Sequence, residues 1–255
     1  MVFIIRWGIL RAKKFFNYKS GCSIMYIVEG NIGAGKSTLL KKIGEAEADV
    51  EIVFEPVNAW HKERSGQSLL ANFYDDIPRW GFSLETYAMA CRVCEHLVEQ
   101  EKLNKYRIME RSIYSGHYCF AHNSYRNGGM SSMEWEIYKQ WFNFLIHGKC
   151  RYPFGFIYLK TDPKVCLERV LKRRRSGEEN ITLEYLEQIG KAHDNFLIKR
   201  LEIVPELEIV PVLVLDGNKP FDKSSTLFNE YCDQIEEFMH KTHIQPATVE
   251  KIITV

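Results

Sequence analysis

The chain has 255 residues, enough for one α/β domain with a full-sized core or for two small domains. Its 34 Lys and Arg nearly balance its 33 Asp and Glu, and both signs are spread along the chain, which excludes a broad basic surface for nucleic acid. No apolar run approaches the roughly 18 residues that a membrane span needs, so no membrane partner is expected. Seven irregularly spaced cysteines, an odd number, indicate reduced thiols in an intracellular protein.

Residues 1–24 carry Lys and Arg among apolar side chains but no Asp or Glu. This pattern is typical of a mitochondrial transit peptide. The alternative is a plain N-terminal extension, because Met25 could itself be a start. We therefore expect a cytoplasmic or mitochondrial protein, with one domain over residues 25–240 and a tail over residues 241–255.

After the leader, short apolar runs alternate with helical patterns, and no internal repeat or linker interrupts them. This alternation predicts a doubly wound α/β fold, a parallel sheet of about five strands with helices on both faces. The expected strands are Ile24–Val28, Ile52–Phe54, Arg107–Met109, Phe156–Leu159 and Val210–Leu215.

Three signals predict helices. Asp162 before Pro163 is typical of a helix start, and Ser131 with Glu134 forms a capping box. Residues 82–103 repeat apolar side chains at helical spacing. The pair Cys91 and Cys94 lies inside that pattern and is interpreted as buried helix residues rather than zinc ligands or a redox couple. The expected apolar face is Leu84, Tyr87, Ala88, Cys91, Cys94, Leu97 and Val98.

A glycine-rich segment follows the first expected strand and precedes a helical pattern. It reads Gly30-Asn31-Ile32-Gly33-Ala34-Gly35-Lys36-Ser37-Thr38 and matches G-x-x-x-x-G-K-[ST]. The glycines let backbone N–H groups converge on a phosphate at a helix N-terminus. Lys36 then reaches the β and γ phosphates, and Ser37 offers its hydroxyl to Mg²⁺. The segment predicts a nucleoside triphosphate site.

The acceptor of the phosphate is a separate question. A switch GTPase is excluded, because the chain has neither N-K-x-D nor D-x-x-G. Val212–Asp216 has the form of a Walker B strand, which leaves an ATPase open. Gly217 follows it instead of a catalytic carboxylate.

Carboxylates close two of the expected strands, where chemistry gathers in a doubly wound sheet. Glu55 follows the second strand, and Glu110 with Arg111 follows the third. Phosphorylation of a hydroxyl group needs a base, a magnesium ligand and a cation over the transferring group. Glu55, Glu110 and Arg111 are our candidates for these three roles. The alternative, that such carboxylates cap the next helix, stays open at this point.

A dense cationic run lies further along the chain, over residues 168–179. Arg169 and Arg173 are four residues apart and share a helix face, so they can point at one anion. Such a run is often a solvated face or a nucleic-acid patch. Beside a phosphate loop, we expect a lid that closes over the donor.

Six segments, in this order and at these separations, resemble the deoxyribonucleoside kinases, the family of deoxycytidine kinase, deoxyguanosine kinase, mitochondrial-type thymidine kinase and the insect multisubstrate enzyme. The resemblance runs from about Ile24 to about Asn218 and implies a P-loop nucleoside kinase fold with an arginine-rich lid. The segments are EGNIGAGKST, EPVNAW, YDDIPRWGFSLETYA, IMERSIYSGHYCF, RRRSGEENITLEYLE and LVLDGN.

The resemblance implies transfer of a phosphoryl group from ATP, or another nucleoside triphosphate, to the 5′-hydroxyl of a deoxynucleoside in nucleotide salvage. It implies that Glu55 is the base, that Ser37 and Glu110 serve Mg²⁺, and that Lys36 and Arg111 serve the phosphoryl group. It also implies a homodimer formed through helices, which the apolar stretch Trp135, Trp141, Phe142 and Leu145 permits. The remaining implied contacts are Arg169, Arg173 and Arg175 in the lid, Tyr74 and Glu178 at the sugar 3′-hydroxyl, Trp60, Leu70 and Phe120 as walls of the base pocket, and Asp216, Gly217 and Asn218 at the donor base.

Base preference in this family depends on the helix that carries Glu85, Ala88 and Arg92, which lie on one helix face. Ala88 and Arg92 match the deoxycytidine and deoxyguanosine kinases, whereas Gly116 stands where those enzymes have an Asp that pairs with this Arg. Glu85 stands where the family commonly has Gln, and a carboxylate can only accept hydrogen bonds.

Two arrangements of Arg92 follow. In one, it approaches guanine O6 or N7 while Glu85 accepts from guanine N1–H and N2–H. In the other, it pairs with Glu85. We expect a purine-leaning or broad enzyme, with guanine slightly ahead.

Two other functions are alternatives to a deoxynucleoside kinase. A nucleoside monophosphate kinase would need a further anion site, for which the chain shows no motif. A non-catalytic nucleotide-binding protein is disfavoured because Glu55, Glu110 and Arg111 are all present.

Overall fold

The computed structural model describes residues 24–47, 49–61, 68–102, 106–175, 177–220 and 226–243. The basic leader therefore lies outside the described residues except for Ile24, and most of the expected tail lies outside them too. Both stay predictions.

Five parallel strands form one sheet in the described part of the chain, in the order β2-β3-β1-β4-β5. In the centre, Ile27 of β1 lies between Met109 of β3 and Phe156 of β4. The expected fold class and all five strands are confirmed, with ends that shift by a residue or two. The strands are β1 (Ile24–Glu29), β2 (Val50–Val53), β3 (Tyr106–Glu110), β4 (Gly155–Lys160) and β5 (Val212–Asp216).

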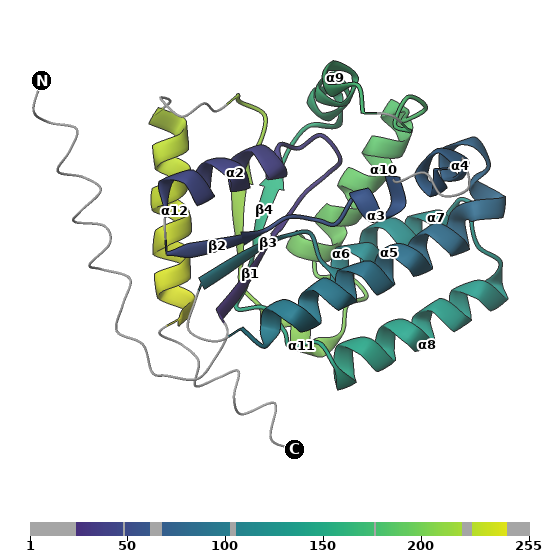
Figure 1. Cartoon of the computed structure of the whole chain (residues 1–255), viewed down its shortest axis with the longest axis horizontal. Helices are drawn as coiled ribbons and strands as arrows, with labels where there is room; N and C mark the ends of the chain where they lie inside the picture. The colour runs from purple at the N-terminus through teal and green to yellow at the C-terminus, as the bar shows by residue number, and fades with distance from the viewer. Residues whose placement is uncertain are drawn as a thin grey trace, which may run out of the picture.

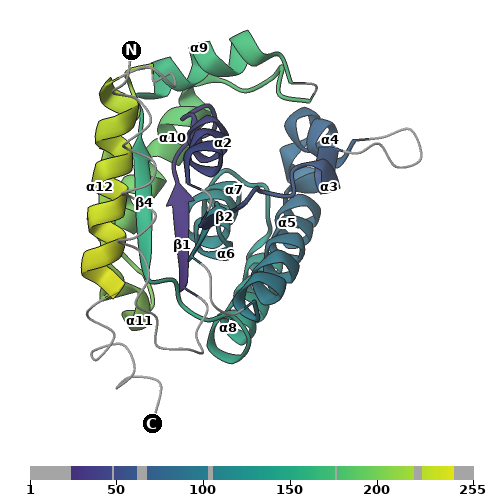
Figure 2. The ribbon, with the colours of Figure 1, turned by 60° about the vertical axis from the view of Figure 1, so that its left-hand side comes forward.

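Helices cover both faces of the sheet (Figure 1). Helices α2 and α12 lie on one face, and α5 and α8 lie on the other, as the turned view in Figure 2 also shows. The helices are α2 (Lys36–Ala46), α3 (Asn58–His61), α4 (Leu69–Asp75), α5 (Ile77–Gln100), α6 (Ile113–Ser115), α7 (His122–Arg126), α8 (Ser132–Gly148), α9 (Pro163–Arg173), α10 (Leu183–His193), α11 (Pro205–Glu208) and α12 (Thr226–His243), with π-helical segments η1 (Gly116–Ala121) and η2 (Asp194–Ile198).

Alternate residues of β1 enter two different cores, as the two-residue period of a strand requires. Ile24, Tyr26 and Val28 pack with residues of α2 and α12. Met25 and Ile27 pack with residues of α5, α8 and η1. Because both faces are covered, β1 is a continuous hydrophobic run from Ile24 to Val28, directly before Glu29.

The expected helix starts are confirmed. The Asp162 side chain accepts a hydrogen bond from Lys164 N at the start of α9, and Ser131 and Glu134 form both bonds of the capping box of α8. Within α5, Cys91 is half-buried and Cys94 is exposed, so the expected burial of the cysteine pair is wrong for Cys94.

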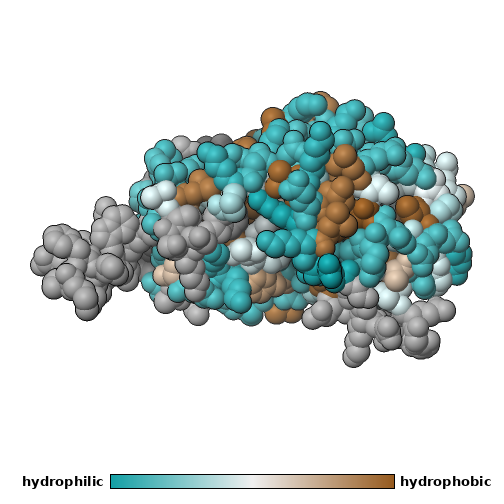
Figure 3. Space-filling model, turned by 90° about the horizontal axis from the view of Figure 1, so that it is seen from above, coloured by the Kyte–Doolittle hydropathy of each residue, from teal (hydrophilic) through white to brown (hydrophobic). Residues whose placement is uncertain are grey.

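A third apolar cluster stands beside the sheet, between α3, α4 and α5. It consists of Trp60, Leu70, Phe73, Leu84 and Ala88. Seen from the α9 side, the surface of the described residues is mostly hydrophilic, with apolar side chains in separate patches (Figure 3). No helix in the described ranges is long and apolar enough to cross a membrane.

Candidate active site

The phosphate loop joins β1 to α2 with glycines in backbone conformations that other residues rarely adopt. Gly33 has φ 79°, and a Cβ there would lie 2.4 Å from the carbonyl oxygen of Cys166. Lys36 Nζ donates to the carbonyl oxygens of Gly30 and Asn31, at 3.1 and 2.8 Å. The Asn31 side chain donates instead to Leu186 O at 2.8 Å, which ties the loop to α10.

Lys36 is buried, and burial lowers the pKa of its ammonium group to about 8. The Arg111 charge lowers this pKa further, whereas the carboxylates of Glu110, Glu55 and Glu29 raise it. A lysine in this position therefore gains a favourable partner when an anionic phosphate arrives.

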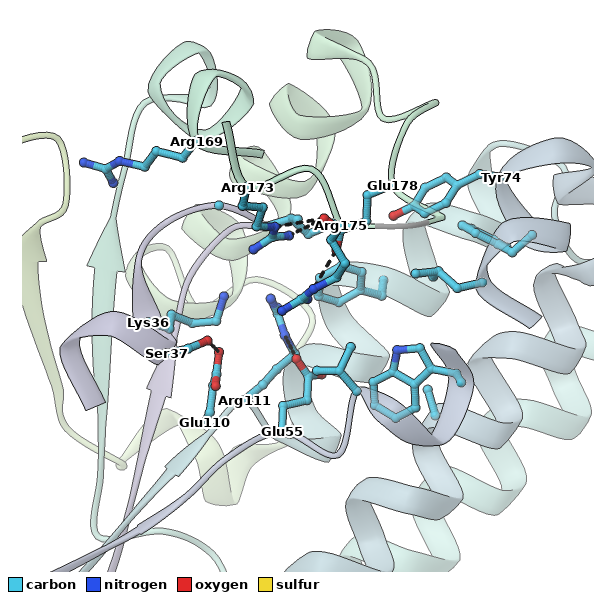
Figure 4. A pocket seen from close by; sticks show the side chains of 18 of the residues that line it. Lys36, Ser37, Glu55, Tyr74, Glu110, Arg111, Arg169, Arg173, Arg175 and Glu178 are labelled. Atoms are coloured by element: carbon cyan, nitrogen blue, oxygen red, sulfur yellow. Dashed lines mark hydrogen bonds and ion pairs between the residues drawn. The ribbon is translucent and has the colours of Figure 1, made fainter. Parts of the chain in front are cut away.

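The two expected magnesium ligands lie together at the sheet edge. Ser37 Oγ at the start of α2 donates to Glu110 Oε1 at the end of β3, at 2.7 Å (Figure 4). A hydroxyl and a carboxylate oxygen are ligands that suit Mg²⁺, which takes few protein ligands and completes its shell with water and phosphate. The residues present thus fit the cation that the sequence predicted.

Glu55 lies between two guanidinium groups. Arg92 donates to Glu55 Oε1 through Nη2 at 2.7 Å and through Nε at 3.1 Å, and Arg111 Nε donates to Oε2 at 3.2 Å. Burial alone would raise the pKa of this carboxyl, but the charges of Arg111, Arg92 and Lys36 together lower it to about 2. Glu55 is therefore ionised over the whole physiological range.

Arg111 directly follows β3 with φ 63°, an uncommon conformation for a residue with a side chain. Its backbone N–H donates to Val28 O at 2.9 Å, which holds this turn against β1. Its guanidinium lies 4.6 Å from the Phe120 ring centre, and its buried Nη1 has no hydrogen-bond partner among the described residues. One donor of Arg111 thus has no partner among the described residues, although the side chain as a whole lines the cavity.

Glu29 is a buried carboxyl that the sequence analysis overlooked. It ends β1 directly before the phosphate loop, and Ser112 Oγ donates to its Oε1 at 2.5 Å. Burial raises the pKa of Glu29, while Arg111 lowers it. This bond links the carboxyl ends of β1 and β3. An acid directly before the glycine-rich segment was the available signal.

Above the sheet edge, the arginines at the end of α9 converge on Glu178. Arg173 donates through Nη2 at 2.6 Å and Nε at 2.9 Å, and Arg175 donates through Nη1 at 3.4 Å. The Tyr74 hydroxyl of α4 is turned toward Glu178 from the other side (Figure 4). The two residues expected at the sugar 3′-hydroxyl and two of the expected lid arginines thus line the same cavity.

Contrary to expectation, the Arg169 side chain does not point with Arg173 toward one shared anion site. Its guanidinium donates to the carbonyl oxygens of Ala34, Gly217 and Asn218, at 3.0, 2.8 and 3.1 Å. Figure 4 shows it turned away from Arg173. The shared helix face does not fix the direction of so long a side chain, because nearby carbonyl groups compete for it. In this structure Arg169 ties the phosphate loop to the loop after β5.

The loop after β5 contains the expected donor-base residues. Asn218 donates to Asp216 Oδ1 through its backbone N at 3.0 Å and through Nδ2 at 2.7 Å. The Asp216 carboxylate thus caps its own loop and does not line the cavity. This geometry does not support the Walker B interpretation of Val212–Asp216.

At the other end of the cavity, Glu85 on α5 is only 4 % exposed. Its carboxyl group makes no hydrogen bond to any described residue, and Arg92 donates to Glu55 instead. Of the two arrangements predicted for Arg92, the pairing with Glu85 is therefore not present. A Cβ on Gly116 would lie 2.8 Å from Arg92 Nη1, so the small residue leaves the space that this guanidinium fills.

These groups border one cavity of about 620 Å³. The expected residues that line it are Ile32, Gly33, Gly35, Lys36, Ser37, Thr38, Glu55, Trp60, Leu70, Tyr74, Glu85, Ala88, Arg92, Glu110, Arg111, Phe120, Arg169, Arg173, Arg175 and Glu178. The cavity is also lined by residues that the sequence analysis did not name as site residues: Val57, Phe73, Leu84, Lys172 and Tyr185. Six of the expected site residues besides Asp216 do not line the cavity: Gly30, Asn31, Ala34, Gly116, Gly217 and Asn218.

A family model described as deoxynucleoside kinase matches residues 26–240. The chain belongs to the deoxynucleoside kinase family. It is an enzyme that phosphorylates a deoxynucleoside in nucleotide salvage, and the glycine-rich loop is its P-loop.

Two curated relatives illustrate the range of this kinase family. The chain is 35% identical to "Deoxycytidine kinase 2" of Gallus gallus over 237 residues, which cover 83% of this chain and 89% of the relative. It is 36% identical to "Thymidine kinase 2, mitochondrial" of Homo sapiens over 208 residues, covering 82% and 76%. Relatives named for different bases thus resemble this kinase almost equally.

Proposed function

We propose that this kinase transfers the γ-phosphoryl group of ATP, or another nucleoside triphosphate, to the 5′-hydroxyl of a deoxynucleoside, with broad or purine-leaning base acceptance. The observation that carries the proposal is the single cavity that joins the P-loop, Glu55 and an apolar pocket. Its polar end suits a triphosphate, and its apolar end suits a nucleobase.

At the polar end, the P-loop backbone and Lys36 bind the donor phosphates, and Arg111, which lines the cavity, stabilises the transferring group. Ser37 and Glu110 would hold Mg²⁺, which neutralises phosphate charge when bound. Arg173 and Arg175 close over the phosphates from the lid.

Glu55 is proposed as the group that orients the 5′-hydroxyl and accepts its proton. A pKa of about 2 makes it a weak base in the free enzyme. A weak base suffices because the phosphoryl transition state is loose, so that the hydroxyl loses its proton late. Its fixed position between Arg92 and Arg111 then matters more than its basicity.

Tyr74 and Glu178 are proposed to hold the sugar 3′-hydroxyl. Both line the cavity, and Glu178 is fixed by Arg173 and Arg175. This arrangement couples the acceptor to the lid, because the residue that contacts the sugar is bound by the arginines that cover the donor.

We also propose a homodimer formed through α8. Met133, Ile137, Trp141 and Phe144 are exposed at spacings that place them along one side of this helix, and Val98 of α5 is exposed as well. The expected contacts change in part, since Trp135 and Phe142 are buried inside the subunit. Sedimentation as a monomer at assay concentrations would contradict this proposal.

We propose two alternative locations for the protein, the mitochondrion and the cytoplasm. The acid-free basic leader supports the first, and the alternative of a plain extension supports the second. A fusion of residues 1–24 to a fluorescent protein, observed in a eukaryotic cell, separates them by its location.

The proposed reaction is tested by incubating the full chain with Mg²⁺, ATP and each deoxynucleoside, and by measuring deoxynucleoside monophosphate by chromatography. Glu55→Gln keeps the shape of the side chain but cannot accept a proton, so we expect kcat to fall about 10²- to 10⁴-fold. Glu136→Gln, the same change at an exposed position of α8, is the matched control and should leave kcat unchanged.

Two outcomes would overturn the proposal. Activity of Glu55→Gln equal to that of the wild type would remove Glu55 from the reaction. Product from deoxynucleoside monophosphates, with none from deoxynucleosides, would support a monophosphate kinase instead.

A further inference from the structure

Glu85 is a carboxyl at the base end of the cavity without a partner. It lies on α5 beside the cavity-lining Leu84 and Ala88, and the rings of Trp60 and Phe120 line the same cavity. Its side chain is nearly excluded from solvent, yet no donor of the described residues reaches it. A buried carboxyl without donors is costly to keep, so its chemistry points to a ligand.

The charged and titratable neighbours of Glu85 come from every element around it. Arg92 on the same helix and Arg111 after β3 both donate to Glu55, and Glu55 itself is negative. The hydroxyl groups of Tyr74 on α4, Tyr138 on α8 and Tyr185 on α10 stay protonated, since burial raises the pKa of each. The charges of Arg92 and Arg111 offset only part of the cost of ionising Glu85.

Burial therefore raises the pKa of Glu85 to about 7, although Arg92 and Arg111 act to lower it and Glu55 adds to the rise. The carboxyl thus changes its protonation within the physiological range. This distinguishes it from Glu55, which is ionised throughout that range.

We propose that Glu85 reads the nucleobase in two forms, as a neutral carboxylic acid that donates one hydrogen bond and accepts another, and as a carboxylate that only accepts. The proposal rests on the proposed function, because it assigns the apolar end of the cavity to the base. It makes base preference a function of pH.

The two forms match different base edges. A neutral carboxyl fits an edge with one donor beside one acceptor, such as the amino group and ring nitrogen of adenine or cytosine. A carboxylate fits two neighbouring donors, the N1–H and N2–H of guanine. Deoxyguanosine therefore gains, relative to deoxyadenosine and deoxycytidine, as pH rises through the range in which Glu85 ionises.

The test is a competition assay. The full chain phosphorylates deoxyguanosine and deoxyadenosine in one mixture with Mg²⁺ and ATP, from about pH 5.5 to about pH 8.5, and the ratio of the two monophosphates gives the ratio of kcat/KM values. Ionisations of the P-loop, of Glu55 and of ATP affect both substrates and cancel in this ratio. We expect the ratio of deoxyguanosine to deoxyadenosine to rise about tenfold.

Two variants sharpen the test. Glu85→Gln always donates and accepts, so its ratio should be flat with pH and close to the low-pH ratio of the wild type. Glu95→Gln makes the same change on the same helix away from the cavity, and it should keep the pH dependence.

The outcomes separate this inference from the proposed function. A ratio that is flat in the active wild type, or that rises equally in Glu85→Gln, overturns the role of Glu85 and leaves the kinase reaction intact. Absence of any monophosphate at every pH overturns the proposed function, and the base reading with it.

Discussion

The two ends of the cavity shift the pKa of a buried carboxyl group in opposite directions. Glu55 at the phosphate end receives hydrogen bonds from two arginines, and the pKa of its carboxyl falls to about 2. Glu85 at the base end lies beside the same arginines without a bond to either, and its pKa rises to about 7. Burial raises both pKa values, so the direction is decided by where the guanidinium groups point.

This difference in pKa matches the charge of the group that each end would bind, a triphosphate at one end and a nucleobase at the other. Triphosphate chemistry needs fixed cations and an ionised acid, which the cluster of Lys36, Arg111 and Glu55 supplies before any ligand arrives. A nucleobase is neutral and presents both donors and acceptors. A carboxyl that can exist in either protonation state suits such a partner better than a fixed charge does.

After the loss expected for Glu55→Gln, the largest expected effect comes from Arg111, at the phosphate end of the cavity. Arg111→Lys keeps the charge but loses the planar guanidinium group, whose Nε donates to Glu55. We expect kcat to fall about 10²- to 10³-fold in a steady-state assay, with little change in the KM for the deoxynucleoside.

The matched control for this change is Arg126→Lys, at an exposed position at the end of α7, which should leave kcat unchanged. If Arg111→Lys raised only KM, Arg111 would act in substrate binding, and the contrast between the two ends would weaken.

The phosphate end was the easier end to predict from the sequence. The P-loop is one continuous segment, and Glu55, Glu110 and Arg111 follow apolar strands whose carboxyl ends must meet in a parallel sheet. Local spacing therefore determines which residues come together. The five strands were predicted from short apolar runs between helical patterns, although β2 and β3 also carry the charged residues Glu51 and Arg107 within the strand.

Helix α5 shows why other parts could not be predicted. The apolar period suggested a face that includes Cys94 and Val98, yet both are exposed, whereas His96 and Glu99 are buried. His96 bonds to the carbonyl oxygen of Arg151 at 2.9 Å, and Glu99 accepts from Arg107 at 3.1 Å. These partners lie outside the helix, so a hydrophobic period cannot reveal them.

The directions in which long side chains point could not be predicted from the sequence either. Arg169 turns toward carbonyl oxygens of the P-loop and of the loop after β5, and Arg92 turns toward Glu55 rather than Glu85. In each case several acceptors lie within reach, and only their positions in the folded chain select one.

The next largest effect concerns the free energy of unfolding. Its pH dependence tests the difference between the pKa values of Glu85 and Glu55. As pH rises from 4.5 toward 7, folded Glu85 keeps a proton that the unfolded chain has lost, so the free energy of unfolding falls. Glu85→Gln does not titrate, and we expect its stability advantage over the wild type to grow by roughly 2 to 3 kcal/mol from about pH 5 to about pH 8. Urea unfolding of the ligand-free protein measures it.

Glu55 makes the opposite contribution to the pH dependence of the free energy of unfolding. Its lowered pKa stabilises the folded state above pH 4.5, and this contribution is lost only as pH falls toward about 2. The stability difference between Glu55→Gln and the wild type should therefore stay constant over the same range. If both variants gave the same pH dependence, the two ends would not differ as described.

The smallest expected effect tests the boundary between the two ends, at Gly116. An added Cβ there would lie 2.8 Å from Arg92 Nη1, so Gly116→Ala must displace the guanidinium that holds Glu55 at 2.7 Å. We expect kcat/KM to fall about tenfold, and by a similar factor for each of the four deoxynucleosides, because the disturbed contact belongs to the phosphate end. Gly148→Ala is the matched control, since a Cβ there meets nothing within 4 Å. A loss confined to one base would instead indicate that Arg92 reads the base directly, and the division of the cavity between Glu55 and Glu85 would have to be redrawn around Arg92.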